Sequence, residues 1–318
     1  MPVDCVSPVR ETTSWIERWL SLLRCPIHQV PLTADQDNHE LCCSAGDHRF
    51  AIRDGILCFL DAAADSDPEF DIKQREIEAR DRVAEGYTSS YSKMKNRLEM
   101  PPSLSAMSAS SSDVVVELGC GTGRITAEYA SKVARTVAMD FSFESLRSLR
   151  EALPAAVRDS VLLIHGDICA PPLAAGSFTK VVSFQVLEHL PSPESRLAAM
   201  CAAVRLLSDD GDLVCTVYNW SEEKKKDARR GLGDDSQKQG FHDTGIFYYN
   251  FEEHELRQLF ADAGLQMNVL EGVRIPVPGG RLLGPFILPV NRLLARTAYG
   301  IRNAHLLLGR GRKMPSRK

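Results

Sequence analysis

The chain has 318 residues, of which 44% are hydrophobic and 25% are charged. This composition is typical of a globular protein with a sizeable core, and the net charge of −4 argues against nucleic-acid binding by the protein as a whole. The sequence shows neither a secretory signal nor an apolar run long enough to cross a membrane. We therefore expect a cytoplasmic protein whose nine cysteines are reduced.

Residues 1–61 contain a segment rich in cysteine and histidine, followed by a strand-like run at 50–60. Two pairs of ligands about a dozen residues apart are typical of structural zinc sites, where thiolates and imidazoles complete a tetrahedron. The predicted ligands are Cys25, His28, Cys43 and His48, with Cys42 as an alternative to Cys43. A module that keeps its fold without a metal is the other interpretation.

Residues 62–112 are polar and charged. Helical patterns extend from Glu69 to Lys95, and Met100–Ser112 is rich in serine and proline, which is typical of a linker. We predict a helical lid followed by a linker.

From residue 113 to residue 275, short β-rich runs alternate with amphipathic helical stretches. Strands are predicted at 114–116, 136–139, 161–164, 180–184 and 213–217, and a final helix at 252–263. Apolar strands that alternate with helices predict a parallel sheet covered on both faces. In such a sheet, ligands bind beyond the carboxyl ends of the strands.

A glycine-rich loop follows the first of these strands. Gly119, Gly121 and Gly123 precede a helix, and glycine lets the backbone approach a ligand where a Cβ atom would clash. Nicotinamide and flavin enzymes use a related loop. Here, however, the spacing is GxGxG and the acidic Glu117 stands before it, where a phosphate-binding loop has little use for a carboxylate.

Carboxylates also end the next two strands. Asp140 suits the two hydroxyls of a ribose, because an ionised carboxylate accepts hydrogen bonds at both oxygens. Asp167 suits the exocyclic amine of adenine, with Ile168 packed on the ring. Each acid alone is explained as a helix cap or a solvated loop residue, but three at the ends of three consecutive strands are not.

With these motifs, residues 113–275 resemble the class I S-adenosylmethionine-dependent methyltransferases. The matching segments are Val116–Gly123, Asp140, Gly166–Ile168 and Phe184–Leu190. The resemblance implies an α/β fold with a Rossmann-like sheet of seven strands, the last antiparallel, and S-adenosylmethionine as the cofactor. It places Gly119 and Gly121 near the methionine moiety and Gln185 beside the sulfonium. The predicted cofactor-binding residues are Glu117, Gly119, Cys120, Gly121, Gly123, Asp140, Asp167, Ile168 and Gln185.

The segment after strand four bears on the methyl acceptor. Methyl transfer needs a base only when the acceptor must lose a proton, and His189 is the predicted catalytic residue for that step. The alternative, that His189 only shapes the pocket, has more weight. The segment lacks an Asp/Asn-Pro-Pro-Tyr motif and resembles enzymes that methylate small molecules, quinones, sterols and lipids. We therefore expect a small-molecule or lipid acceptor, methylated on oxygen or carbon, and no DNA.

An aromatic stretch after strand five supplies further candidates for the acceptor pocket. These are Tyr218, His242, Tyr248 and Tyr249, with coverage of the sheet edge as the alternative.

The first module has a resemblance of its own. Its Cys-Pro-x-His, its Cys-to-His pair and the run Phe50–Ile56 are similar to the zinc ribbon ahead of some bacterial rRNA guanine methyltransferases. They are also similar to short zinc proteins that partner methyltransferases. His28 replaces the usual second cysteine, and the second pair is wider by one residue. An rRNA or tRNA methyltransferase that binds RNA with this module and with the basic C-terminal tail is the alternative function.

Residues 276–318 form the last predicted region. From residue 281 onward there are nine Lys or Arg and no Asp or Glu, which leaves 29 basic and 42 acidic residues in the rest of the chain. Leucines and isoleucines among the arginines predict a basic amphipathic tail that contacts a membrane peripherally, or RNA. The alternatives are a disordered end and a helix packed on the domain with a basic outer face.

Overall fold

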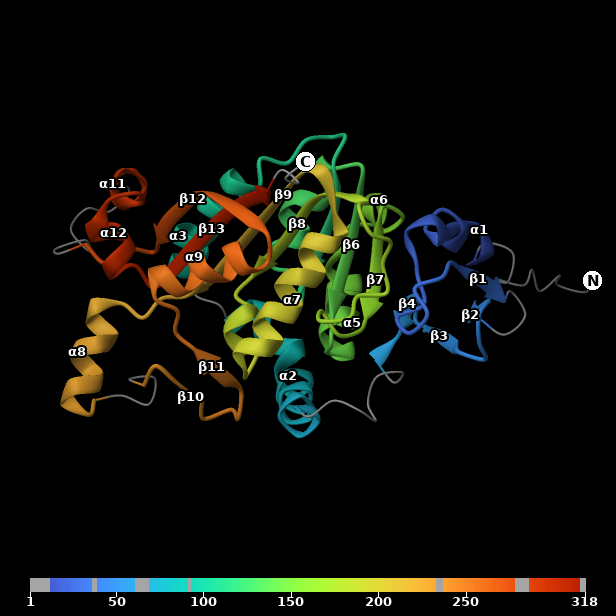
Figure 1. Ribbon diagram of the computed structural model, residues 1–318, viewed down its shortest axis with the longest axis horizontal. Helices are drawn as coiled ribbons and strands as arrows, with labels where there is room; N and C mark the ends of the chain where they lie inside the picture. The colour runs from blue at the N-terminus through green and yellow to red at the C-terminus, as the bar shows by residue number, and fades with distance from the viewer. Residues whose placement is uncertain are drawn as a thin grey trace, which may run out of the picture.

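The computed structural model describes residues 12–35, 39–60, 69–90, 93–232, 237–277 and 286–314. One eleven-stranded sheet runs the length of the molecule, and helices pack on both of its faces (Figure 1). The strand order is β1-β2-β3-β4-β7-β6-β5-β8-β9-β13-β12.

The last seven strands in this order are the predicted methyltransferase-like sheet. Their bounds are β5 Val114–Leu118, β6 Arg135–Asp140, β7 Val161–His165, β8 Phe178–Phe184, β9 Leu207–Tyr218, β12 Leu265–Val273 and β13 Leu306–Lys313. Strands β5 to β9 pair in parallel, and β13 lies antiparallel between β9 and β12. The prediction of an α/β fold with a last, antiparallel strand is confirmed.

Alternate residues of the strands face two helical layers. One layer comprises α7 (Pro193–Leu206) and α9 (Glu253–Asp262). The other comprises α3 (Lys93–Met107), α4 (Thr126–Tyr129) and α5 (Phe143–Ala152). Val116 thus faces the first layer and its neighbour Val115 the second, as the two-residue period of a strand requires. The remaining short helical segments are η5 Ala130–Lys132, α6 Ala155–Arg158, η6 Leu187–His189 and α8 Glu222–Arg230.

The N-terminal module is joined to this sheet edge to edge. It contains α1 Thr12–Glu17, η2 Leu20–Leu22 and the strands β1 Leu32–Asp35, β2 Glu40–Cys43, β3 Arg49–Arg53 and β4 Ile56–Cys58. Strands β1 to β4 pair antiparallel, and β4 then pairs in parallel with β7, Ile56 opposite Leu163. Leu41 and Phe50 of the module share one hydrophobic cluster with Leu162 of the sheet. The small β module was predicted, but its continuity with the large sheet was not.

Two predictions about the connecting segments were wrong. The predicted linker Met100–Ser112 is mostly helix: α3 continues to Met107, whose side chain is buried against Val115 and Ile125. The predicted tail is not an appendage, because its residues 306–313 form β13, the antiparallel strand of the sheet. In both segments tertiary packing decides the structure, which local composition does not show.

The rest of the C-terminal region forms short elements at the end of the sheet opposite the N-terminal module (Figure 1). These are the hairpin β10 Gln239–Phe241 and β11 Phe247–Tyr249, together with α11 Ile287–Leu294 and α12 Ala298–Asn303. Helix α2 (Phe70–Ser90) crosses the carboxyl ends of the parallel strands. Among the described residues, no helix combines the length and the apolar character needed to span a membrane.

Candidate cofactor and acceptor site

The main pocket lies at the carboxyl ends of β5, β6, β7 and β8, with α2 across it. The cavity measures about 130 Å³. Eight of the nine predicted cofactor residues line it, as does the predicted catalytic residue: Glu117, Gly119, Cys120, Gly121, Asp140, Asp167, Ile168, Gln185 and His189. These predicted residues therefore share one pocket.

The glycine loop needs glycine for two different reasons. A Cβ atom at Gly119 would lie 2.4 Å from the side chain of Val186, and the residue has a φ of 81°. Gly123 does not line the pocket. A Cβ atom there would meet Leu149 of α5 at 2.1 Å, so this glycine allows close packing between the loop and a helix.

Asp140 holds the loop as well as facing the pocket. Its Oδ2 accepts a hydrogen bond from the Gly121 amide at 2.7 Å, and its Oδ1 accepts one from the Ser142 amide at 2.9 Å. Burial raises the pKa of Asp140, and these two hydrogen bonds oppose the rise. Each oxygen has a second lone pair, so the carboxylate retains capacity to accept from a ribose hydroxyl.

Glu117 is buried at the base of the pocket. Its Oε2 accepts hydrogen bonds from Thr126 at 2.7 Å and from the Tyr129 hydroxyl at 2.8 Å. Burial raises the pKa of Glu117 to about 7, although these two bonds act against the rise. The contacts fix helix α4 against β5, so Glu117 has a structural as well as a pocket-lining position.

Asp167 has partners at both oxygens. Its Oδ1 accepts from the Cys169 amide at 2.8 Å, and its Oδ2 pairs with Lys73 of α2 at 2.8 Å. Ile168 beside it is buried and lines the pocket. Lys73 thus lies against the acid that was predicted to bind adenine, and α2 closes over that part of the pocket.

The comparisons with known proteins agree with this geometry. The family described as methyltransferase domain matches residues 116–215. A ubiquinone biosynthesis O-methyltransferase of Burkholderia pseudomallei is 30% identical over 164 residues, which cover 50% of this chain and 67% of that enzyme. The chain belongs to the class I S-adenosylmethionine-dependent methyltransferases. A demethylmenaquinone methyltransferase of Thermobifida fusca is 28% identical over 130 residues, 41% of this methyltransferase and 54% of that one.

Solved structures support the fold. One similar structure is a chain of the complex of the Haloferax volcanii Trm112 methyltransferase activator with a methyltransferase. The TM-score is 0.53 at 20% identity, and the match covers 74% of this chain and 98% of that one. The Burkholderia thailandensis 1,6-didemethyltoxoflavin-N1-methyltransferase, solved with S-adenosylhomocysteine, has a TM-score of 0.52 at 17% identity, covering 84% and 96%. The family described as Trm112p-like protein matches residues 17–55 of the N-terminal module.

The pocket fits S-adenosylmethionine as this methyltransferase's cofactor. Gly119 lines the pocket without a side chain, and Glu117, Asp140 and Asp167 lie at or near the carboxyl ends of β5, β6 and β7. The cavity is smaller than the roughly 300–1,000 Å³ of most ligand sites, and α2 lies across it.

His189 lies in η6 and lines the pocket. Its Nδ1 is 2.7 Å from the backbone carbonyl of Phe247, which can only accept, so Nδ1 carries the proton and Nε2 the lone pair. Burial, with Arg80 nearby, lowers the pKa of His189 well below its usual value. The imidazole is therefore neutral at pH 7.

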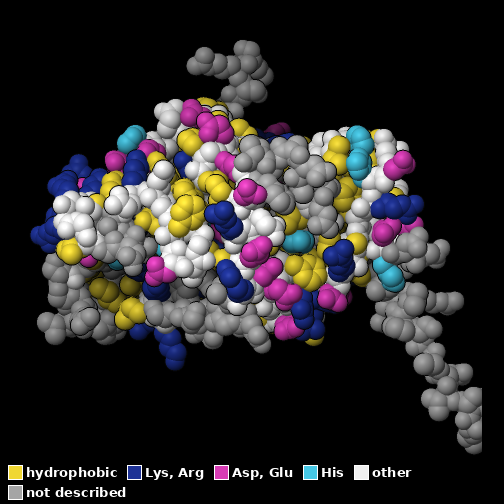
Figure 2. Space-filling model, turned by 90° about the horizontal axis from the view of Figure 1, so that it is seen from below, with side chains coloured by type: hydrophobic (Ala, Val, Ile, Leu, Met, Phe, Trp, Pro, Cys, Tyr) yellow, Lys and Arg dark blue, Asp and Glu magenta, His cyan; other side chains and the backbone are white. Residues whose placement is uncertain are grey.

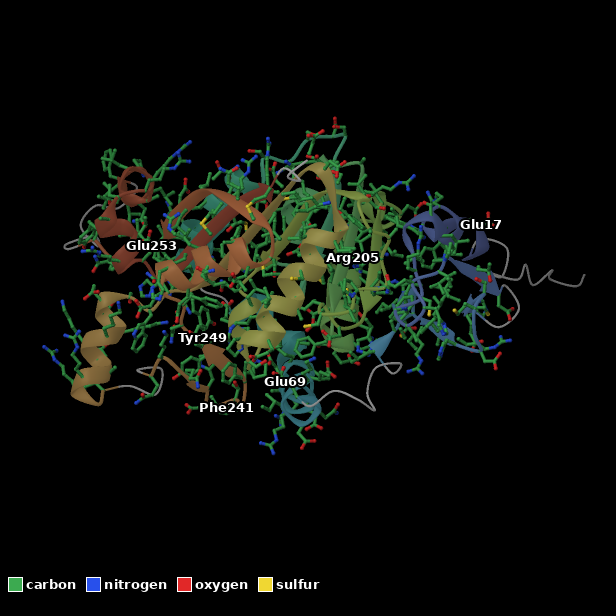
Figure 3. All side chains as sticks on the ribbon, viewed as in Figure 1. Glu17, Glu69, Arg205, Phe241, Tyr249 and Glu253 are labelled. Carbon is green, nitrogen blue, oxygen red and sulfur yellow. The ribbon has the colours of Figure 1, made fainter. Side chains whose placement is uncertain are left out.

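Three of the four residues predicted for the acceptor pocket form a row of neighbouring rings that begins at His189. The rings of His189 and Tyr218 are 5.7 Å apart, those of Tyr218 and His242 6.3 Å, and those of His242 and Tyr248 4.7 Å. Tyr249 departs from this group: its hydroxyl donates to Glu255 of α9 at 2.7 Å. Figure 3 shows Tyr249 on the β10–β11 hairpin, at the same edge of the sheet as the start of α2.

Three charged residues of helix α2 also line the pocket and were not predicted from the sequence: Lys73, Glu76 and Arg80. Glu76 and Arg80 form an ion pair at 3.1 Å, and Glu76 Oε1 is 4.0 Å from His189 Nδ1. Burial raises the pKa of Glu76 to about 7, although Arg80 opposes the rise. Their spacing of three and four residues places all three on one face of the helix, and this spacing can be read from the sequence. The sequence does not show, however, what that face covers.

The Cys/His cluster is separate, in the N-terminal module. The Cys25 sulfur, the His28 Nδ1 and the Cys43 sulfur all lie within 4.8 Å of one another, with His28 Nδ1 3.3 Å from Cys43 Sγ. The ring centroid of His48 is 5.0 Å from that of His28. Cys43 belongs to the cluster and Cys42 does not, because successive residues of β2 face opposite sides.

Proposed function

We propose that the enzyme transfers a methyl group to an oxygen or an acidic carbon of a small-molecule or lipid acceptor. The observation that carries the proposal is His189, a buried neutral imidazole in the cofactor pocket with its tautomer set by the Phe247 carbonyl. The names of the relatives, which include ubiquinone and menaquinone biosynthesis enzymes, support an acceptor of this kind.

The residues would divide the work as follows. The glycine loop, Asp140, Asp167 and Ile168 would hold S-adenosylmethionine, which supplies an electrophilic methyl group on a sulfonium. His189 would accept the acceptor's proton at Nε2 as its hydroxyl or carbon becomes the nucleophile. Tyr218, His242 and Tyr248 would form an aromatic wall against which a flat or apolar acceptor packs.

The test is transfer of a labelled methyl group. Cell extract is incubated with the enzyme and methyl-labelled S-adenosylmethionine, then separated into RNA, lipid and polar small-molecule fractions for mass spectrometry. Label in the lipid or polar fraction, lost in His189→Ala, supports the proposal. Label confined to RNA would establish the alternative, an rRNA or tRNA methyltransferase.

We also propose that the N-terminal cluster holds a structural zinc ion with the ligands Cys25, His28, Cys43 and His48. Two thiolates and imidazole nitrogen are the donors zinc prefers, and three of the four already converge. Metal analysis of the purified protein tests this, with Cys43→Ser as the variant expected to lose zinc.

A peripheral membrane contact is our proposal for the end of the molecule formed by α8, α11 and α12. Helix α8 carries five Lys or Arg and three acids, and basic side chains gather at this end of the molecule (Figure 2). On α11 and just before it, Leu293 is 79% exposed and Phe286 67% exposed, next to Arg292. Exposed apolar side chains among cations fit the interface of an anionic lipid bilayer.

Flotation with vesicles tests this contact. Binding to vesicles that contain phosphatidylglycerol but not to vesicles of phosphatidylcholine alone is expected, and it should be lost in the double variant Phe286→Ser, Leu293→Ser. Equal recovery of this variant and the wild type with the vesicles would reject this surface.

A further inference from the structure

Glu99 of α3 is a buried carboxylate that the proposed function does not use. It is 2% exposed and contacts groups from three other parts of the chain. Arg274 Nη1 donates to its Oε1 at 2.7 Å. Gln185 Nε2 donates to its Oε2 at 3.4 Å, and Arg124 Nη2 lies 3.7 Å from the same oxygen.

Two of these partners have unusual backbone conformations. Gln185, just after β8, has a φ of 59°, and Arg274, just after β12, has a φ of 56°. A residue other than glycine in this left-handed region costs on the order of 1–3 kcal/mol and persists where its surroundings hold it. The contact of both side chains with one carboxylate is such a constraint.

Arg124 brings the glycine loop into the same cluster. It follows Gly123 directly, lines the cofactor pocket and donates through Nη1 to Asn96 of α3 at 3.0 Å. Glu99 therefore connects α3 with the end of β8, the end of β12 and the glycine loop. Of these elements, the end of β8 and the glycine loop line the pocket.

The contact with Glu99 determines how the amide of Gln185 is turned. A carboxylate only accepts hydrogen bonds, so the amide atom that faces Glu99 has to be the NH2 group. The carbonyl end of the amide dipole then points away from Glu99. Gln185 itself lines the cofactor pocket, so its amide is held in one orientation at the pocket wall.

We propose that Glu99 is a positioning residue that orients Gln185 so that the pocket favours the cationic sulfonium of S-adenosylmethionine over the neutral thioether of S-adenosylhomocysteine. The inference rests on the predicted place of Gln185 beside the sulfonium. A fixed dipole with its negative end toward a cation stabilises that cation without reorganising, whereas it has little effect on a neutral sulfur.

The test compares the two ligands on the full-length protein by isothermal titration calorimetry. Glu99→Gln keeps the shape of the side chain and removes its charge. The affinity for S-adenosylmethionine should fall about tenfold, which corresponds to the loss of one charge-assisted hydrogen bond, and that for S-adenosylhomocysteine by less than about threefold. Gln185→Leu should show the same selective loss, and the double variant should lose no more than either single variant.

Asp212→Asn is the matched control. Asp212 is also a buried carboxylate with several cationic partners, but it lies in β9 away from the Tyr218 end that faces the pocket. It should change stability and leave the ratio of the two affinities as in the wild type.

Equal weakening of both ligands in Glu99→Gln would mean that Glu99 only supports the fold, and unchanged affinities would mean that it plays no part in binding; both overturn the proposal. If Glu99→Gln does not fold, Gln185→Leu still tests the proposal, because an unchanged ratio of the two affinities in that variant would overturn it. The readout needs no methyl acceptor, so its failure is separate from failure of the proposed function.

Discussion

Replacing Asp140 by asparagine should weaken cofactor binding more than a change of one atom would suggest. Both carboxylate oxygens accept from backbone amides, Gly121 at 2.7 Å and Ser142 at 2.9 Å. In Asp140→Asn, one of these N–H groups faces an NH2 group, donor against donor. The variant therefore loses a hydrogen bond to a charged group and leaves a buried N–H without an acceptor.

The magnitude follows from those two losses. A hydrogen bond to a charged group contributes about 1.5–3 kcal/mol, and an unsatisfied buried donor costs about 1–3 kcal/mol. If about 3 kcal/mol of this combined loss reduces the free energy of binding, the Kd for S-adenosylmethionine rises roughly 100-fold. Asp140→Ala should weaken binding to a similar degree, because neither variant can hold both the loop and the ribose.

Calorimetric titration with S-adenosylmethionine measures the effect. Glu144→Gln is the matched control, since Glu144 is a partly exposed acid in the first turn of α5, close in sequence, and the variant should bind as the wild type does. A Kd within about threefold of the wild type for Asp140→Asn would refute the reasoning and show that the ribose is held elsewhere.

Three further predictions concern α2, the far end of β9 and the metal cluster. Lys73→Met should raise the affinity for S-adenosylmethionine up to about fivefold. The partly exposed ion pair of Lys73 with Asp167 contributes on the order of 1 kcal/mol, and it has to open before adenine can bind Asp167. Weaker binding in titrations would contradict this prediction. Asp212→Asn should lower the free energy of unfolding, measured by urea titration, by about 3–5 kcal/mol, because Asp212 pairs with Lys180 and two arginines. A loss below about 1 kcal/mol would mean that these pairs contribute little. Burial alone would raise the pKa of Asp212, but these partners hold it well below its usual range. The contribution of Asp212 to the free energy of unfolding is therefore complete above about pH 4 and declines as the pH falls below that. Unfolding curves at several pH values would show this decline. Cys43→Ser should lose zinc and lower the melting temperature, whereas Cys42→Ser should keep both; equal effects would contradict the alternation of β2.

The cofactor side of the pocket was predictable because its chemistry is local. Each acid lies at or near the end of a strand, and parallel strands bring their carboxyl ends to one edge of the sheet. We therefore expected Glu117, Asp140 and Asp167 to lie close together. Gly123 was assigned to the pocket because a motif does not distinguish a glycine that faces a ligand from one that faces a helix. Its contact with Leu149 is a tertiary feature.

Features that are assembled from distant segments of the chain were harder to predict. Residues 306–313 are rich in arginine and glycine, which suggests a tail, yet Arg310 and Arg312 pair with Asp212 and Gly309 and Gly311 leave room for Phe260. The buried Glu99 lies just before Pro101 and Pro102, in a stretch whose composition predicts a linker. Neither feature has a periodic signal.

The pairing of β4 with β7 has a consequence for how the protein behaves at low concentration. A sheet edge carries unpaired N–H and C=O groups that invite association with other chains. Here the partner of that edge belongs to the same chain, so its local concentration does not depend on how much protein is present. The outermost strand becomes β1, which has only four residues, and Arg49 pairs with its Asp35. Dilution therefore cannot separate the N-terminal module from the catalytic sheet, and the two should unfold together.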